Sequence, residues 1–239
     1  MGGARFLRAP RLHRQSSRLQ DGAVDQHFIA FSADRSSSLS TLDGALTSRP
    51  FALLHPPMIY DRTWLEKTFR AKPRQKFLFF WGHQPSKDGR ITTSCFSQWW
   101  HAPFTVDGLS YPTAEHWMMA EKARLFGDAP TATQILRAAS PKQAKQLGRQ
   151  VSGFDGTKWD ADKYRIVTEG SFQKFRQNAA LREYLLSTHD RVLVEASPVD
   201  RVWGIGLAAD DERAVNPLLW RGENLLGFAL MQARDRLRG

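Results

Sequence analysis

The sequence predicts an α+β fold, a helix-rich single domain with a small antiparallel sheet. Three observations lead to this prediction. A hydrophobic content of 41% and eight tryptophans in 239 residues supply a sizeable core. Several segments after residue 110 begin with helix-capping residues. The β-prone runs, by contrast, are few and short.

Short apolar or β-prone runs mark the expected strands. Phe77–Trp81 is an apolar run that ends at Gly82, which predicts a buried strand. Asp107-Gly108 stands between two β-prone stretches within residues 104–111, and this dipeptide favours a tight hairpin. Residues 191–196 form a further strand-like run.

Polar caps and prolines mark the helix starts. Thr113 can cap a helix that begins at about residue 114. Ser140-Pro141 opens another helix, with proline at the first helical position, and Asp160 can cap a long one. The expected helices cover about residues 114–126, 131–139, 141–148, 160–177, 178–187 and 223–237.

Residues 1–57 differ from the rest of the chain and are predicted to be a disordered or non-essential N-terminal extension. The first 55 residues hold seven Arg and no Lys, and four Asp and no Glu. Organelle transit peptides have such a composition, but this segment lacks a clear amphipathic repeat. A natural start of translation at Met58 is a second explanation. The folded domain is expected to cover residues 58–239.

The composition also limits compartment and partners. No run of eighteen apolar residues exists, so no membrane span is predicted. Cys95 is the only cysteine, which excludes an internal disulfide and suits the reducing cytoplasm, where we expect the protein. The net charge of +10, of which +7 remains without the first 55 residues, suits a nucleic-acid partner or a phosphorylated substrate.

The most informative segment for function is the expected helix 114–126. It carries Glu115 and Lys122 seven residues apart, close to two turns, so both lie on one face. Glu115 falls in the first turn, where the helix dipole favours its ionised form. Two opposite charges on one face suit a catalytic site, and an ordinary salt bridge explains the spacing equally well.

Tryptophan next to glycine is a second pattern. Trp81-Gly82 and Trp203-Gly204 each follow a predicted strand, which suits a pocket wall that stacks on a flat heterocycle. Core tryptophans beside turn glycines are the alternative. Glu195, at the end of an apolar run, is a second candidate acid or else the partner of a neighbouring arginine. The seven histidines show no metal-binding spacing.

Several short motifs in order resemble those of the NADAR family of YbiA-like N-glycosidases. They run from about residue 77 to 237, nearly the whole expected domain. The matching segments are FFWGH (79–83), FSQW (96–99), VDG (106–108), YPTAEH through KAR (111–124), KF (174–175), VE (194–195), DRVWG (200–204) and NLLG (224–227).

This resemblance implies a hydrolase of the N-glycosidic bond between ribose and a nitrogen base. One branch of the family acts on ribosylamino-pyrimidine 5′-phosphates, the reactive early intermediates of riboflavin biosynthesis, as metabolite damage control. The Trp-Gly-Ile-Gly segment favours that branch. The alternative is an ADP-ribosyl glycohydrolase that frees guanine or a small acceptor. Neither activity requires a metal or a redox cofactor, so none is expected.

The chemistry assigns roles to the motif residues. Cleavage builds positive charge on the ribose, which the Glu115 carboxylate would stabilise. Lys122 either donates to a phosphate or ring oxygen or attacks C1′ as a neutral amine to form a Schiff base. A neighbouring Glu115 carboxylate would raise the lysine pKa and oppose the second route, so both roles stay open.

The remaining expected site residues bind substrate. Trp81 and Trp203 are expected to stack on the base, and Asp200 and Asn224 to bind the ribose or the base edge. The phosphate donors are expected among Arg124, Lys174 and Arg221. The other expected substrate-binding residues are Gly82, Ser97, Glu195 and Gly204.

A reading of another class is a non-catalytic nucleic-acid-binding module. The net charge of +10 and the tryptophans favour it. Against it, the basic residues are scattered along the chain, and no RNA- or DNA-binding motif occurs. A nucleic acid is therefore expected as a partner only under this reading or the ADP-ribosyl-guanine alternative.

Overall fold

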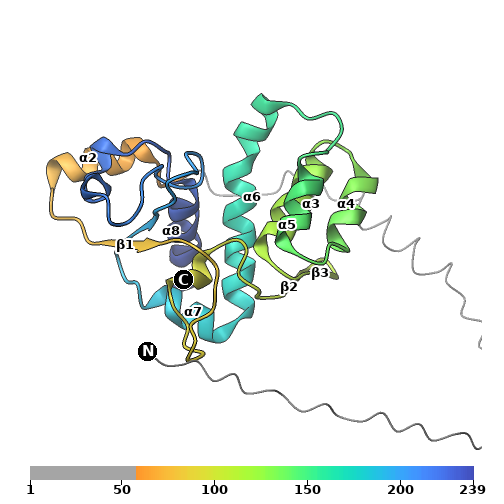
Figure 1. The fold of residues 1–239 in the computed structure, drawn as a ribbon, viewed down its shortest axis with the longest axis horizontal. Coiled ribbons are helices and arrows are strands. Elements are labelled where there is room, and N and C mark those ends of the chain that lie inside the picture. The colour runs from red at the N-terminus through yellow and green to blue at the C-terminus, as the bar shows by residue number, and fades with distance from the viewer. Residues whose placement is uncertain (1–57) are drawn as a thin grey trace, which may run out of the picture. The chain divides into compact units, whose positions relative to one another are not determined.

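The computed structural model describes residues 58–239 (Figure 1). The N-terminal extension expected over residues 1–57 lies outside the described residues, so its boundary stays a prediction. Within residues 58–239, no helix combines the length and the apolar character that a bilayer crossing requires.

The described residues confirm the α+β expectation, with helices dominant. The helices are α2 (Arg62–Ala71), α3 (Ala114–Leu125), α4 (Ala129–Leu136), α5 (Pro141–Gly148), α6 (Gly156–Gln177), α7 (Ala179–Leu186) and α8 (Leu225–Arg238). The strands are β1 (Phe77–Phe80), β2 (Phe104–Val106), β3 (Leu109–Tyr111) and β4 (Val192–Glu195). The short 3-10 turns are η1 (Thr93–Phe96), η2 (Glu212–Val215) and η3 (Pro217–Leu219).

The hairpin is present as the sequence predicts. β2 and β3 pair antiparallel, with Phe104 opposite Tyr111. Asp107 and Gly108 connect them with φ angles of 49° and 77°. Two residues with positive φ are what a type I′ turn requires, and that turn matches the twist of the strands it joins.

The second strand pair was not predicted as a pair. β1 and β4 run parallel, with Phe77 opposite Val192 and Phe80 opposite Glu195. The two segments are far apart in the sequence, so local patterns identify each strand but not its neighbour. Parallel pairing brings the carboxyl ends of both strands, at Phe80 and Glu195, to one edge.

Two helix starts follow the expected caps, whereas α6 begins at another aspartate and Asn178 precedes α7 without a side-chain cap bond. Thr113 caps α3 by accepting from the His116 N–H, and Ser140 caps α5 ahead of Pro141. The long helix α6 begins at Gly156, because Asp155 accepts from the Lys158 N–H and not Asp160 as expected. Asp160 lies inside the helix and pairs with Lys163 at 2.6 Å.

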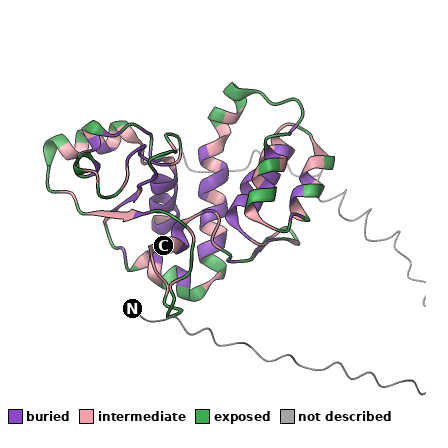
Figure 2. Cartoon of the chain, in the orientation of Figure 1, coloured by how far each residue is buried: buried purple, intermediate pink, exposed green. Residues whose placement is uncertain are grey.

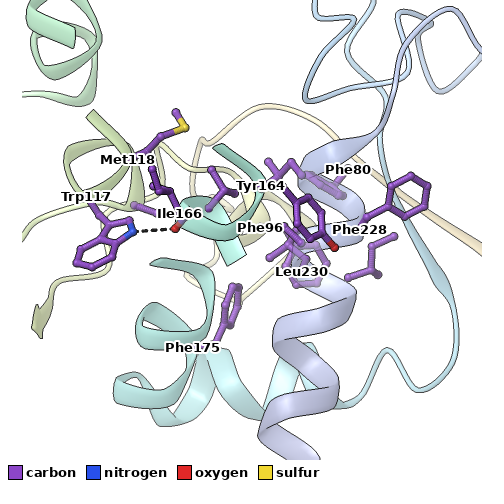
Figure 3. Packing of buried hydrophobic residues seen from close by; sticks show 14 of the residues in the cluster. Phe80, Phe96, Trp117, Met118, Tyr164, Ile166, Phe175, Phe228 and Leu230 are labelled. Atoms are coloured by element: carbon purple, nitrogen blue, oxygen red, sulfur yellow. Dashed lines mark hydrogen bonds between the residues drawn. The ribbon is translucent and has the colours of Figure 1, made fainter. Parts of the chain in front are cut away.

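The core lies where α6 packs against α8 and α8 packs against β4. Figure 2 shows the facing sides of α6 and α8 as buried. Helix α3 packs against α4, α5 and α6. The indole N–H of Trp117 in α3 donates to the Ile166 carbonyl at 2.8 Å, as Figure 3 shows. A Cβ at Gly170 would clash with that indole, so this glycine permits the close contact between α3 and α6.

Candidate active site

A cavity of about 320 Å³ lies at the carboxyl ends of β1 and β4. This volume is at the lower end of the range of small-molecule sites. Its walls come from segments that are distant in the sequence: the exit of β1, the turn after η1, α3, α5, β4 with its following loop, and α8. The lining residues are Trp81, Gly82, His83, Ser97, Gln98, Trp99, Glu115, Met118, Lys145, Glu195, Ser197, Val199, Asp200, Trp203 and Leu226.

Glu115 enters the cavity from the first turn of α3. Its side chain is almost fully buried, with the residue 2% exposed, and its Oε1 atom has no hydrogen-bond partner. Burial raises the pKa of Glu115 to about 7, and the charge of Asp200 adds to that rise. The positive charge of Lys145 and a hydrogen bond from Trp99 oppose it. Desolvation thus outweighs the helix N-terminus, which favours the ionised form.

Glu195 enters the same cavity from the end of β4. Burial raises its pKa to about 8, and the negative charges of Asp200 and Glu115 raise it further, while Lys145 lowers it. Its Oε2 atom is also buried without a partner. Two carboxyl groups in one poorly solvated cavity, where the charge of Glu115 raises the pKa of Glu195, do not both ionise readily near neutral pH. One of them is therefore suited to donate a proton and the other to accept one.

Asn224 fixes the backbone beside Glu195. It lies fully buried before α8 in the left-handed conformation, with φ 56° and ψ 32°. Its Oδ1 accepts from the Glu195 N–H at 2.9 Å, and its Nδ2 donates to the Leu193 carbonyl at 2.9 Å. A Cβ at Gly227 would lie 2.1 Å from that carbonyl, so only glycine lets α8 approach β4 this closely.

Lys174 fixes the opposite wall. Its ammonium group is completely buried in α6 and donates to the carbonyls of Cys95 at 2.7 Å and Ser97 at 2.9 Å. Burial lowers the pKa of Lys174 to about 8. The lysine thereby holds the turn that presents Ser97, Gln98 and Trp99 to the cavity. Lys174 and Asn224, both expected to bind substrate, do not line the cavity, since backbone groups occupy their polar atoms.

Gln98 is a cavity residue that the sequence interpretation missed. Its carbonyl accepts from the Glu115 N–H at 3.0 Å, which ties this turn to the start of α3. Both side-chain amide atoms, Oε1 and Nε2, are buried without a partner. A buried amide left unpaired is costly unless a ligand or water completes it. The only signal in the sequence was its place within the FSQW motif.

Lys145 is another cavity residue that the sequence interpretation missed. It extends from α5 into the cavity and influences the pKa of both Glu115 and Glu195. Its Nζ atom lies 5.9 Å from the centre of the Trp99 ring. No local motif marks Lys145, because its position depends on how α5 packs against α3.

Lys122 does not share the cavity with Glu115. Its Nζ atom donates to the Gly148 carbonyl at 2.8 Å and lies 4.2 Å from the centre of the Phe154 ring. Burial lowers the pKa of Lys122. Two helical turns separate the two side chains by about 10 Å along α3, which explains why one face of a helix does not make one site.

Two of the expected phosphate donors also lie outside the lining of the cavity. Arg124 forms a buried ion pair with Glu121 in α3. Burial lowers the pKa of Arg124, but the negative charge of Glu121 raises it, and the net shift is upward. Arg221 is exposed, and its backbone N–H donates to the Ile205 carbonyl at 2.9 Å.

The loop after β4 forms the outer wall. Asp200 uses its Oδ1 to accept from the N–H groups of Val202 and Trp203, a local turn that places both Asp200 and Trp203 at the cavity. A Cβ at Gly204 would lie 2.8 Å from the Glu195 carbonyl, so glycine lets the loop return to the strand. Trp81, 59% exposed, stands at the cavity mouth.

Backbone hydrogen bonds hold this loop against the segment that enters α8. The N–H groups of residues 221 and 223–226 donate to carbonyls within residues 201–205. The wall is therefore rigid although it contains no regular strand. In residues 58–239, no three His, Cys, Asp or Glu side chains are grouped as metal ligands.

Comparison with known proteins identifies the family. The sequence profile of the NADAR domain matches residues 79–238, which include every lining residue of the cavity. The chain belongs to the NADAR domain family. It is 41% identical over 165 residues to the N-glycosidase R617 of Acanthamoeba polyphaga mimivirus, covering 67% of this chain and 95% of that protein.

Cellular relatives and a solved structure agree with this assignment. The chain is 34% identical over 144 residues to the N-glycosidase YbiA of Escherichia coli (strain K12), covering 60% of this chain and 79% of YbiA. The NMR structure of E. coli YbiA superposes with a TM-score of 0.55 at 30% identity, covering 69% of this chain and 86% of that one. The NADAR resemblance is confirmed, and the chain is an enzyme of the N-glycosidase class.

Proposed function

We propose that this N-glycosidase hydrolyses the bond between C1′ and nitrogen in a ribosylamino-pyrimidine 5′-phosphate, an early riboflavin intermediate, and releases ribose 5-phosphate. The observation that carries the proposal is the pair of buried carboxyl groups, Glu115 and Glu195, in one small cavity with tryptophans at its wall. Removal of a reactive intermediate is the expected role, as metabolite damage control.

The two carboxyl groups divide the work according to their surroundings. The positive charges of Lys145 and Arg149 favour the ionised form of Glu115, and so does a hydrogen bond from Trp99. Glu195 faces the charges of Asp200 and Glu115, which favour its protonated form. We therefore assign Glu195 as the proton donor and Glu115 as the carboxylate.

The reaction follows from that assignment. The C1′–N bond breaks with its electron pair passing to nitrogen, and Glu195 delivers a proton to that nitrogen. The Glu115 carboxylate stabilises the positive charge that develops on C1′ and the ring oxygen. Water then adds to C1′ and gives a proton to Glu115. A proton returns from Glu115 to Glu195 through solvent, which restores both groups.

The remaining cavity residues suit a phosphorylated nucleoside-like substrate. Lys145 is the single Lys or Arg among the lining residues, so we assign it to the 5′-phosphate. Trp81 and Trp203 offer flat faces to the base. The unpaired amide of Gln98 offers an NH₂ donor group and a carbonyl acceptor to a base edge or to ribose hydroxyls.

Lys122 then supports the site from outside. By holding the Gly148 carbonyl, it fixes the end of α5, the helix that carries Lys145. A Schiff base at C1′ would require the Lys122 amine inside the cavity, so the proposal uses no covalent intermediate on that lysine.

The test is to incubate the full chain with the pyrimidine ribosylamine 5′-phosphate and to measure ribose 5-phosphate. We expect release by the wild type, a loss of roughly a hundredfold or more in Glu115→Gln, and no change in Glu183→Gln, an exposed control on α7. No release by folded wild type would refute the proposal. Release from ADP-ribosylated guanosine instead would assign the alternative substrate.

A further inference from the structure

A second cavity, of about 560 Å³, lies at the amino ends of β1 and β4. Residues 72–76, which precede β1, form one side, and residues 189–191, which precede β4, form the other. The backbone bond from the Val192 N–H to the Lys76 carbonyl, at 2.9 Å, joins the two segments. We call this cavity the basic groove.

The charge of the basic groove is strongly positive. Lys72, Arg74 and Lys76 are exposed, and the structure of residues 58–239 gives their side chains no ion pair. Arg191 adds a fourth cation, and its guanidinium donates to the Thr188 and Ser187 carbonyls. The one acid, Asp190, is already engaged by Arg238 at 3.1 Å.

The arrangement of the cations favours a ligand with repeated charges. Lys72, Arg74 and Lys76 stand at alternate positions of a non-helical segment, and all three line the groove. Because all three side chains line one groove, their positive charges face the same space. A row of spaced cations fits successive phosphates better than it fits a single phosphate group.

The lining residues also argue against recognition of a ligand through its bases. Among the described residues that line the basic groove, the His189 imidazole is the one aromatic ring and no aliphatic side chain is present, so a base finds little surface on which to stack. Contacts would be made to phosphates by long, exposed side chains. Such contacts give affinity without sequence selectivity.

The backbone at the other side of the groove is held in an uncommon conformation. His189 has a φ of 50°, the left-handed region that non-glycine residues seldom adopt. Its carbonyl accepts from the Arg238 guanidinium at the end of α8. This contact fixes the 189–191 segment beside the cations of residues 72–76.

We propose that the basic groove binds the phosphodiester backbone of a nucleic-acid strand, without base selectivity, at the end of the β1–β4 pair opposite the catalytic cavity. The basic residues are scattered in the sequence, and the parallel pairing of two distant strands gathers them. This site is independent of the substrate assigned to the catalytic cavity.

The experiment measures fluorescence anisotropy of a labelled single-stranded oligothymidylate with the full chain over a series of salt concentrations. We compare the triple variant Lys72→Gln, Arg74→Gln, Lys76→Gln with a control that also removes two Lys and one Arg. The control is Lys87→Gln, Arg137→Gln, Lys142→Gln, all exposed positions away from the groove. Residues 1–57 are common to both variants, so any binding by them does not separate the two.

We expect the groove variant to bind at least tenfold more weakly and to show a shallower salt dependence, by the equivalent of about two to three phosphates. The control should bind within twofold of the wild type. Equal losses in the two variants would overturn the proposal, because they would indicate diffuse attraction to net charge. Absence of wild-type binding, or full displacement by inorganic phosphate at the same total charge, would overturn it as well.

A parallel hydrolysis assay separates this inference from the catalytic one. The groove variant should keep wild-type release of ribose 5-phosphate, because no groove residue lines the catalytic cavity. Loss of hydrolysis with unchanged oligonucleotide binding would contradict the separation of the two sites.

Discussion

The two ends of the β1–β4 strand pair differ in charge and in solvent access. At the carboxyl ends, Glu115 is buried and the half-buried Glu195 has a buried Oε2 atom, and desolvation raises the pKa values of both. At the amino ends, Lys72, Arg74 and Lys76 are exposed to solvent. Desolvation shifts the pKa of a buried group and so suits it to proton transfer, whereas an exposed charged group attracts ligands of opposite charge. One strand pair therefore carries a site suited to proton transfer and a site suited to electrostatic binding.

Replacing a buried acid should give the largest effect. Glu195→Gln keeps the shape and removes the proton donor, so we expect turnover to fall by roughly a hundredfold or more. Steady-state release of ribose 5-phosphate measures this, with exposed Glu212→Gln as the control. Turnover within threefold of wild type in Glu195→Gln would remove this residue from the mechanism.

Removing the side chain that holds the Glu195 backbone should give the next largest effect. Asn224→Ala leaves the Glu195 N–H and the Leu193 carbonyl unpaired in a buried place and puts alanine at positive φ. Each unpaired buried group costs about 1–3 kcal/mol, so the unfolding free energy should fall by about 2 kcal/mol or more. Urea denaturation measures it.

The matched control for that variant is Asn178→Ala, which also loses two hydrogen bonds but at a partly exposed place. Water can replace those bonds, so the expected loss is below about 1 kcal/mol. Equal losses in the two variants would contradict the role assigned to Asn224.

Removing the cavity cation should have an intermediate effect. Lys145→Met takes away a positive charge that lowers the pKa values of Glu115 and Glu195, so both values should rise further. We expect the alkaline limb of the pH–rate profile to move to higher pH and turnover to fall by about tenfold. Lys142→Met, exposed on the same helix, should leave the profile in place. If the alkaline limb stayed in place in Lys145→Met, the assigned effect of Lys145 on the two carboxyl groups would be wrong.

The pH dependence of stability should distinguish the catalytic cavity from the basic groove. Glu115 and Glu195 have folded-state pKa values of about 7 and about 8 and ordinary values of 4.5. Between these limits the folded state binds more protons than the unfolded state, so stability present below pH 4.5 is lost as pH rises toward 8. Urea denaturation of wild type should follow this slope, and the double variant Glu115→Gln, Glu195→Gln should flatten it. Neutralising the groove should leave it unchanged.

Lys122→Met should have the smallest effect on catalysis. Its amine lies outside the cavity, so we expect turnover within about fivefold of wild type and a modest loss of stability of about 1 kcal/mol from the lost bond to Gly148. Borohydride added during turnover should give no sugar adduct at Lys122 by mass spectrometry. An adduct there would show that the lysine enters the cavity during the reaction.

Local signals in the sequence predicted much of the fold. Thr113, Ser140-Pro141 and Asp107-Gly108 act within a few residues of themselves, and the elements that they mark are present. Asp155 and Asp160 are both possible caps five residues apart, and sequence alone does not choose between them. The β1–β4 pairing joins distant segments, and no local pattern encodes it.

The site was harder to predict for the same reason. Glu115, Trp81, Asp200 and Trp203 were expected at a site, and they meet in one cavity. Lys174 and Asn224 have the chemistry of ligand-binding residues, but backbone carbonyls and an N–H occupy them once the chain folds. Gln98 was marked only by its place in the FSQW motif, and Lys145 by no motif, because tertiary packing brings Lys145 to the cavity.

The bonding of the loop after β4 has a consequence for how this enzyme can be altered. Its course depends on backbone bonds between residues 201–205 and 221–226, so most of its outward side chains are free to vary. Val199 lines the cavity and is 85% exposed, yet its side chain supports no neighbour in the core. A library at this position would sample new substrate preferences on an unchanged scaffold, and natural drift here could diversify the enzyme without loss of folding.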